Sequence, residues 1–387
     1  VLGFWDGENA RLNLSPNDGS TVVEHELGSE LWAYAPMNLL PHLKWLKEPS
    51  YTTAVHVAYM DGPIQAFDVK AFDEDAVHIN GWGTILVAGM RLGGGDYPNV
   101  DIDSNPDTDN SFTSRSAYVI VDVTDPNKEP QIIGEITHPD LGFTTGVPTI
   151  MKEGDDWYLV FGSGPNDIST ATSVGITSPD GTVLDDREAK LFRYKLNEGN
   201  RGFDAGGPIN IPTVGEVNSF AGDMVAHDWN SDYSDDAVYF GVVEGTELDS
   251  SGAIYRYVSA DARDAAADVE LLVDVNQPVI EKPLLKTVSG KNWVLFGAGR
   301  HLTSFDVRDT NQNSFHGVIE PRENYPSVSL STLLDISNVS VKADSIDING
   351  NLTASGGDLS SAVDGQTTFN QLKAHILSDP GVNGWKY

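Results

Sequence analysis

The sequence predicts an all-β fold: an irregular β-propeller with long loop insertions and a few short helices. Glycine and proline, 38 and 20 of 387 residues, separate many short runs of Val, Ile, Tyr and Phe, which is typical of strands between turns. A unit made of an apolar run, a polar loop and an aromatic run also recurs along the chain. Repetition of this kind is typical of propeller blades, and we expect about seven of them. A two-sheet sandwich would explain the alternation but not the repeat.

Each repeat contains an apolar run that ends in glycine, at 85–89, 157–162, 237–241 and 293–297. An aromatic run follows each of them, at 117–122, 190–195, 253–258 and 301–306. In two repeats a further run begins 14 residues before the glycine, at Pro148 and Pro283. The glycines are 73, 79 and 56 residues apart, so we expect the connections to vary in length.

Two short helices are expected beside the strands. Residues 36–47 carry apolar side chains at helical spacing around Pro41, which predicts a short or broken helix. Residues 368–377 place Phe369, Leu372 and Ile376 on one helical face. We expect one propeller domain over 1–387, in which 320–365 is an insertion that is strand-rich or weakly ordered.

Composition excludes several classes of function. Lys and Arg number 24 against 57 Asp and Glu, a net charge of −33, which argues against binding to nucleic acid or anionic lipid. The absence of cysteine excludes disulfides, thiolate metal sites and a Cys nucleophile. No apolar run approaches the length of about 18 residues that spans a bilayer. The chain starts with neither a methionine nor a signal peptide, so we expect it to be an excerpt of a longer, secreted or cell-surface protein.

Residues 228–236 are the strongest functional signal. Oxygen-bearing side chains occupy positions 1, 3, 5 and 9 of this segment, with a backbone carbonyl at position 7, which is the ligand order of a calcium loop. These candidate ligands are Asp228, Asn230, Asp232, Ser234 through its carbonyl, and Asp236. The match is incomplete, because Tyr233 stands where Gly is usual and Tyr239 where a bidentate Glu is usual. The alternative is a solvated acidic turn.

The runs on either side of this segment, 224–227 and 237–241, both read as strands. The segment is therefore expected to connect two strands, and a bound cation would neutralise its clustered carboxylates and order the hairpin. Neither a vacant coordination position nor a nucleophile indicates catalysis, so we interpret the site as structural.

A second acidic segment alternates oxygen ligands in the same way. Its candidate ligands are Asp101, Asp103, Asn105, Asp107 and Asp109. Pro106 at position 6 prevents the turn with positive φ that a calcium loop uses. A second cation site and a solvated loop both remain open for this segment.

The sequence gives little support for an enzymatic function. The nine histidines lack the spacing of a zinc protease, and Ser, His and Asp are scattered. A quinoprotein dehydrogenase propeller of the pyrroloquinoline-quinone type would need a cysteine pair and periodic tryptophans. A surface receptor of the FG-GAP type would need calcium loops in several blades, and one is clear. We therefore expect a protein that is not an enzyme.

Several segments, taken in order, resemble the C-terminal propeller domain of the PilC/PilY family of type IV pilus-tip and biogenesis proteins. The motifs are 30–36 (ELWAYAP) with 40–43 (LPHL), 81–91 (GWGTILVAGMR), 118–126 (YVIVDVTDP), 140–149 (DLGFTTGVPT), 160–164 (VFGSG), 293–300 (WVLFGAGR), 314–317 (SFHG) and 384–387 (GWKY). The resemblance covers most of residues 24–317. It is specific because the motifs occur together and in the family's order.

The resemblance implies a calcium site of the form DxNxDxxxD at 228–236, whose occupancy tunes pilus extension against retraction. It also implies surface adhesion and twitching motility, with minor pilins at the pilus tip and a host or abiotic surface ligand as partners. The chain lacks an Arg-Gly-Asp tripeptide, so the integrin binding of some family members is not expected here. The adhesive N-terminal module of the family is absent from this sequence.

Overall fold

The computed structural model describes most of the chain, and everything below concerns those residues. They are 11–14, 23–26, 30–49, 51, 58–95, 97–100, 111–165, 188–197, 202–204, 208–212, 219–245, 250–263, 266–302, 306–308, 310–341, 345–353 and 357–387. They form two compact units, one within 1–167 and 190–209 and the other within 168–189 and 210–387. The expectation of one domain over 1–387 stays a prediction.

The first unit contains two antiparallel sheets. One has the order β3–β4–β7–β8 and the other β12–β11–β10–β9, with β13 also paired to β11. Their strands are β3 (Ile64–Lys70), β4 (Trp82–Gly89), β7 (Tyr118–Asp122), β8 (Gln131–Ile136), β9 (Thr149–Glu153), β10 (Asp156–Gly162), β11 (Lys190–Asn197), β12 (Gly202–Asp204) and β13 (Pro208–Asn210). Two hairpins complete the strands, β1 (Arg11–Leu14) with β2 (Val23–Glu26) and β5 (Tyr97–Val100) with β6 (Phe112–Ser114).

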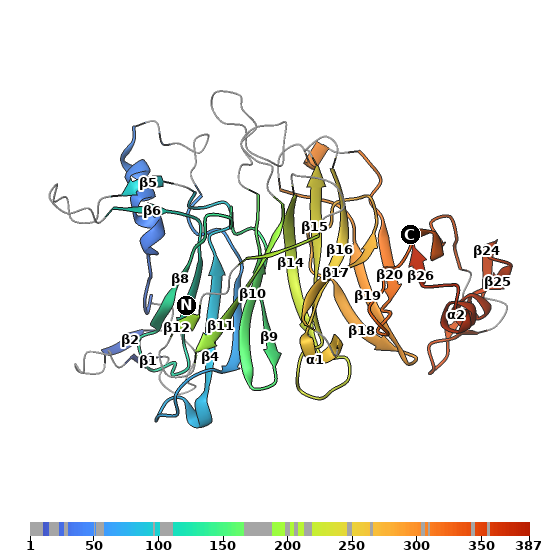
Figure 1. Cartoon of the computed structure of the whole chain (residues 1–387), viewed down its shortest axis with the longest axis horizontal. Coiled ribbons are helices and arrows are strands. Elements are labelled where there is room, and N and C mark those ends of the chain that lie inside the picture. Colours follow the sequence, from blue (N-terminus) through green and yellow to red (C-terminus); the bar gives the residue numbers. More distant parts are fainter. Residues whose placement is uncertain are drawn as a thin grey trace. The chain divides into compact units, whose positions relative to one another are not determined.

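The second unit also contains two large sheets, which are antiparallel except for the parallel pair β26–β21. Its sheets have the orders β14–β15–β16–β17 and β18–β19–β20–β26–β21. Their strands are β14 (Ser219–His227), β15 (Ala237–Gly245), β16 (Ser250–Val258), β17 (Asp268–Asp274), β18 (Leu284–Val288), β19 (Lys291–Gly297), β20 (Phe315–Ile319), β21 (Leu333–Asp335) and β26 (Gly384–Lys386). Figure 1 shows β14–β17 as neighbouring long strands. Two further hairpins are β22 (Ser345–Ile346) with β23 (Leu352–Thr353) and β24 (Asp358–Val363) with β25 (Gln366–Thr368).

Each unit has its own apolar core. In the first, side chains such as Val87, Ile120 and Phe161, from the two sheets, form one buried cluster. In the second, Tyr239, Leu272 and Phe296 belong to the corresponding cluster. The inward-facing residues of β4 alternate with outward ones, whereas β15 is buried along nearly its whole length. The all-β prediction is confirmed.

The sequence repeat corresponds to the sheets. All four glycine-ended runs are second strands (β4, β10, β15 and β19), and three aromatic runs are third strands (β7, β11 and β16). Of the strand expected at 301–306, the described residues 301, 302 and 306 belong to no strand, and β20 is the third strand of the sheet that contains β19. The Asp306 carboxylate accepts hydrogen bonds from Arg300 Nε (2.9 Å) and from the backbone N–H of Leu302 (2.7 Å).

The described residues form four sheets of four or five strands, fewer than the roughly seven blades expected. The repeat itself occurs four times, once in each of these sheets. In the expected insertion at 320–365, the described residues contain β21 to β24 with only short pairings.

Both predicted helices are confirmed. Residues Met37–Lys47 form a 3₁₀ helix, η1, with Pro41 inside it, and Glu135 of β8 accepts hydrogen bonds from the backbone N–H groups of Met37 and Asn38 at its start. Helix α2 (Phe369–Ser378) begins after Thr368, whose side chain and Gln371 form a capping box. Shorter helical turns are η2 (Ile79–Gly81), α1 (Ala260–Arg263), η3 (Asp306–Arg308) and η4 (Leu330–Thr332). Within the described part of the chain, no helix is long and apolar enough to cross a membrane.

Candidate metal site in the β14–β15 connection

The candidate calcium loop connects β14 to β15, as the flanking runs predicted. The two strands pair up to His227 and Ala237 at the base of the loop. The backbone N–H of Asp236 donates to the carbonyl oxygen of His227 (2.9 Å), which closes the loop. Nine residues are thereby held between two ordered strands of the second unit.

The Asp228 carboxylate organises the first turn of the loop. Its Oδ1 accepts from the backbone N–H groups of Asn230 (3.2 Å) and Ser231 (2.6 Å), and its Oδ2 from that of Tyr233 (2.8 Å). Asn230 Oδ1 and Asp232 Oδ1 likewise accept from the N–H two residues later, both at 2.9 Å. Successive Asx turns therefore wind the segment tightly, with the side-chain oxygens directed at the loop's own backbone.

Tyr233 takes the backbone conformation for which a calcium loop usually uses glycine. Its φ is +70°, and that of Ser231 is +62°, both in the left-handed region. The Tyr233 side chain is 85% exposed, so its bulk meets no packing obstacle. The sharp turn at position 6 thus forms despite the tyrosine, at a cost in backbone strain.

Asp236, the last candidate ligand, lies in a different environment. It is 3% exposed, and its Oδ2 accepts from the backbone N–H of Trp229 (2.7 Å). Its Oδ1 lies 3.0 Å from the Arg322 guanidinium. Burial raises the pKa of the Asp236 carboxyl, while the Trp229 N–H and Arg322 oppose that shift. This carboxylate therefore already has a cationic partner supplied by the protein.

The residue types and the backbone fit a hard cation, because all the donors are oxygens and the turn has formed. The side chains are not gathered around one centre, however. Among the residues that the structure describes, no three His, Cys, Asp or Glu side chains are grouped so that they could hold a metal ion. Asp228 and Asp232 accept hydrogen bonds from the backbone of the outer turn of the loop. Asp236 instead forms an ion pair with Arg322. A cation bound in this loop would therefore have to compete with Arg322 for the Asp236 carboxylate.

A buried polar network lies behind the loop. Trp229 donates its indole N–H to the Tyr239 hydroxyl (2.8 Å). The Arg256 guanidinium lies 3.0 Å from the Glu320 carboxylate, and neither side chain is exposed. Arg256 also donates to the carbonyl oxygens of Tyr325 and Pro326. Burial raises the pKa of Glu320 to about 7, against the opposing effect of Arg256.

The sequence did not predict that Arg256, Glu320 and Arg322 would lie at this site. Arg256 carried a usable signal, because it is the single charge within an otherwise apolar and aromatic run at 253–258. Glu320 and Arg322 had none, since they follow a short strand in a segment that we assigned to an insertion. Arg300 forms an ion pair with Asp306, with 2.9 Å between its Nη2 and the carboxylate Oδ1. The second candidate site, Asp101 to Asp109, lies outside the described residues.

Comparisons with known proteins agree with the family resemblance. Two relatives from Xylella fastidiosa (strain Temecula1), both named type IV pilus biogenesis factor PilY1 homolog, are each 24% identical over 318 and 336 residues. Each alignment covers 80% of this chain, but the chain spans only about a fifth of either relative, 21% and 20%. No family model matches.

Among solved structures, the C-terminal domain of Pseudomonas aeruginosa PilY1 matches with a TM-score of 0.56 and 18% identity, over 98% of this chain and 70% of that one. At this identity the match establishes the fold, which is a β-propeller. Together with the two relatives, it confirms the resemblance to the C-terminal domain of the PilC/PilY family.

Proposed function

We propose that this chain is a calcium-binding propeller module of a type IV pilus biogenesis factor, acting at the cell surface. The observation that carries the proposal is the 228–236 loop, in which alternate oxygen ligands are wound on a backbone with φ of +62° and +70° at Ser231 and Tyr233. The names of the two Xylella relatives support the pilus assignment. The net charge of −33 supports a setting rich in divalent cations.

The ion would be held by the side chains of Asp228, Asn230, Asp232 and Asp236 and by the carbonyl of Ser234. When bound, calcium would neutralise these carboxylates and join the outer turn of the loop to its base. Arg322 performs part of that role now, because it balances Asp236 from within the second unit. Calcium binding and the Arg322 ion pair are therefore expected to compete for the same carboxylate.

Calorimetric titration of the purified chain with calcium tests the site. Asp232→Ala is the sharpest variant, since Asp232 is exposed and its loss removes a charged ligand without disturbing the core. We expect it to abolish binding, while Glu281→Ala, an exposed carboxylate outside the loop, leaves binding unchanged. Wild-type affinity should weaken as ionic strength rises. Full binding by Asp232→Ala would remove the calcium assignment.

At the level of the cell, we propose that calcium occupancy regulates pilus extension and retraction and supports surface adhesion, with minor pilins and a surface ligand as partners. A lysine that mimics the bound ion belongs at Asp232, because a lysine at Asp236 would be buried next to Arg322. In the native host, Asp232→Ala and Asp232→Lys should change piliation and twitching in opposite directions. Wild-type behaviour of both variants would leave the loop with a structural role only.

We also propose that the module is not an enzyme. The sequence offers no cysteine pair for a quinoprotein dehydrogenase. Reconstitution with pyrroloquinoline quinone followed by a dye-linked alcohol oxidation assay should give background rates. Robust turnover would favour the dehydrogenase alternative.

A further inference from the structure

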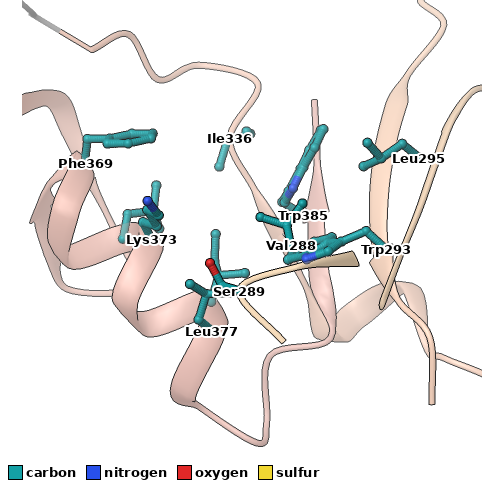
Figure 2. Close-up of a pocket in the computed structure, with 11 residues that line it drawn as sticks. Val288, Ser289, Trp293, Leu295, Ile336, Phe369, Lys373, Leu377 and Trp385 are labelled. Carbon is teal, nitrogen blue, oxygen red and sulfur yellow. The ribbon is translucent and has the colours of Figure 1, made fainter. Parts of the chain in front are cut away.

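A cavity of about 430 Å³ lies beside the last sheet of the second unit, where helix α2 faces β18, β19 and β26 (Figure 2). Its size falls within the range of small-molecule sites, roughly 300–1,000 Å³. Almost every lining side chain is apolar. The lining residues are Val288, Ser289, Trp293, Leu295, Ile336, Phe369, Leu372, Lys373, Ile376, Leu377 and Trp385.

The sequence builds one wall of this cavity from the helix that it predicts. Phe369, Leu372 and Ile376 share a face of α2, and all three line the cavity. The capping box of Thr368 and Gln371 fixes where the helix starts, and therefore which face is presented. On the other side lie Trp293 of β19 and Trp385 of β26, two strands that β20 separates in the sheet (Figure 2).

Trp293 supplies a buried donor with no protein acceptor. Its side chain is 7% exposed, and among the described residues its indole Nε1–H has no hydrogen-bond partner. A buried N–H without a partner costs free energy that an acceptor in the cavity would recover. Among the described residues that line the cavity, Trp293 alone has such a buried donor.

Lys373 is the only charged side chain among the described residues that line the cavity. It projects from α2, across the cavity from Trp293 (Figure 2), and its Nζ is 3.3 Å from Asn351 Oδ1. In a chain with 57 acidic residues, a cavity lined by one ammonium group and no carboxylate is selective by charge. An apolar ligand with a negative group complements it.

We propose that this cavity binds an aliphatic carboxylate. The alkyl chain packs against Trp293, Trp385 and Phe369, and the carboxylate lies beside Lys373. The free N–H of Trp293 accommodates a second oxygen, so a hydroxy acid binds more tightly than the unsubstituted acid. This site shares no residue with the 228–236 loop and does not depend on calcium.

Titration of the ¹⁵N-labelled chain, followed through its indole N–H signals, tests the proposal. The eight tryptophans give few signals, and the one lost in Trp293→Phe is assigned to Trp293. The probes are decanoate, 10-hydroxydecanoate, decanol and decylammonium. We expect decanoate to shift the Trp293 signal saturably and to bind about tenfold more tightly than decanol, the contribution of a charge-assisted hydrogen bond. The hydroxy acid should bind several-fold more tightly than decanoate.

Two variants separate the two polar contacts. Lys373→Met should remove the preference for decanoate over decanol, whereas Lys286→Met, an exposed lysine on β18 that does not line the cavity, should keep it. Trp293→Phe keeps an aromatic ring but should bring 10-hydroxydecanoate to the affinity of decanoate. The wild-type chain alone can overturn the proposal: absence of a saturable shift with decanoate, or equal binding of decylammonium, would show that the cavity does not select an aliphatic carboxylate.

Discussion

The two units contain equivalent connections, each between the first and second strand of a sheet, that balance their acidic side chains in different ways. In the β3–β4 connection, Asp75 accepts from the backbone N–H groups of Val77 and His78, both at 2.7 Å. The His78 ring then bridges Asp75 (3.1 Å) and Asp122 (3.0 Å) and stacks on Phe72. In the β14–β15 connection, Asp228 has the same turn-forming role, but the loop contains no such bridging ring.

The difference lies in where the partner of the carboxylates comes from. His78 belongs to its own connection, whereas Arg322 reaches the β14–β15 loop from a distant part of the second unit and pairs with Asp236 alone. In the part of the chain described, no ion pair is found for Asp228 or Asp232. In one connection the ring of His78, from the same segment, holds the turn-forming Asp75, and the other leaves two carboxylates for an ion from solution. This contrast is why we place the metal site in the second unit.

The two connections also differ in backbone strain. The first uses Asn80 (φ +53°) and Gly81 (φ +78°) for its left-handed turn, residues that tolerate this conformation. The second uses Ser231 and Tyr233 at the corresponding kind of turn. Strained residues persist when the surroundings over-determine them and cluster at ligand sites, so the strain agrees with a site that binding completes.

The largest expected effect concerns the buried pair in each unit. Glu320→Ala should destabilise the chain by about 3–5 kcal/mol, because the Arg256 guanidinium stays charged and fully buried without its partner. His78→Leu should cost only about 1–3 kcal/mol, since Asp122 keeps its hydrogen bonds from Thr124. Denaturant unfolding measures both, with the exposed Glu323→Ala as the control. A larger loss for His78→Leu would reverse the comparison.

Arg322 gives the next prediction. Arg322→Met removes the cation that competes for Asp236 while keeping an apolar stem of similar length. Calcium affinity measured by calorimetry should rise about tenfold, equivalent to about 1.4 kcal/mol. Arg263→Met removes an arginine that pairs with Asp268 and Glu270 instead, and it should leave the affinity unchanged. Weaker calcium binding in Arg322→Met would mean that the arginine supports the site.

Tyr233→Gly should have a smaller effect, in the same direction. Relief of the left-handed conformation favours glycine by about 1–2 kcal/mol, and the greater freedom of glycine in the unfolded chain offsets about 0.5–1 kcal/mol of it. We expect a net gain of at most about 1.5 kcal/mol in thermal or denaturant unfolding, with calcium affinity raised a few-fold. In contrast, Gly81→Ala in the first connection should destabilise, because its φ is +78° and its added Cβ would lie 2.7 Å from the Phe72 carbonyl oxygen.

The parts of the fold that could be predicted from the sequence are those set by residues close together along the chain. The glycine-ended runs could be predicted as strands because each is a short apolar run bounded by turn residues. Helix α2 was readable from three side chains at helical spacing. The described residues of the strand expected at 301–306 lie in no strand, and Asp306 accepts hydrogen bonds from two nearby donors, Arg300 and Leu302. Periodicity in the sequence does not report such interactions.

The candidate site was predicted in its ligands but not in its surroundings. Positions 228–236 are contiguous, so their spacing could be read directly. Arg322 is 86 residues from Asp236, and only the fold brings the two together. The cavity beside α2 could not be predicted from the sequence either, since Trp293, Lys373 and Trp385 come from three separate segments. Contacts distant in sequence decide both the competition at the metal site and the chemistry of the cavity.

The smallest expected effect is a pH dependence confined to the first connection. Hydrogen bonds from the backbone N–H groups of His78 and then Val77 lower the pKa of Asp75 to about 2, from 3.8. Because the folded-state pKa is lowered, the charged carboxylate contributes stability that is fully present above pH 3.8 and is lost as the pH falls through about 2.

Asp75→Asn retains an acceptor oxygen but cannot titrate. Its melting temperature should therefore lie below that of the wild type at pH 5 and approach it as the pH falls toward 2. Asp73→Asn, exposed on the same connection, controls for the loss of one negative charge. A difference between wild type and Asp75→Asn that stays constant from pH 5 to pH 2 would show that the charge of Asp75 does not hold this turn.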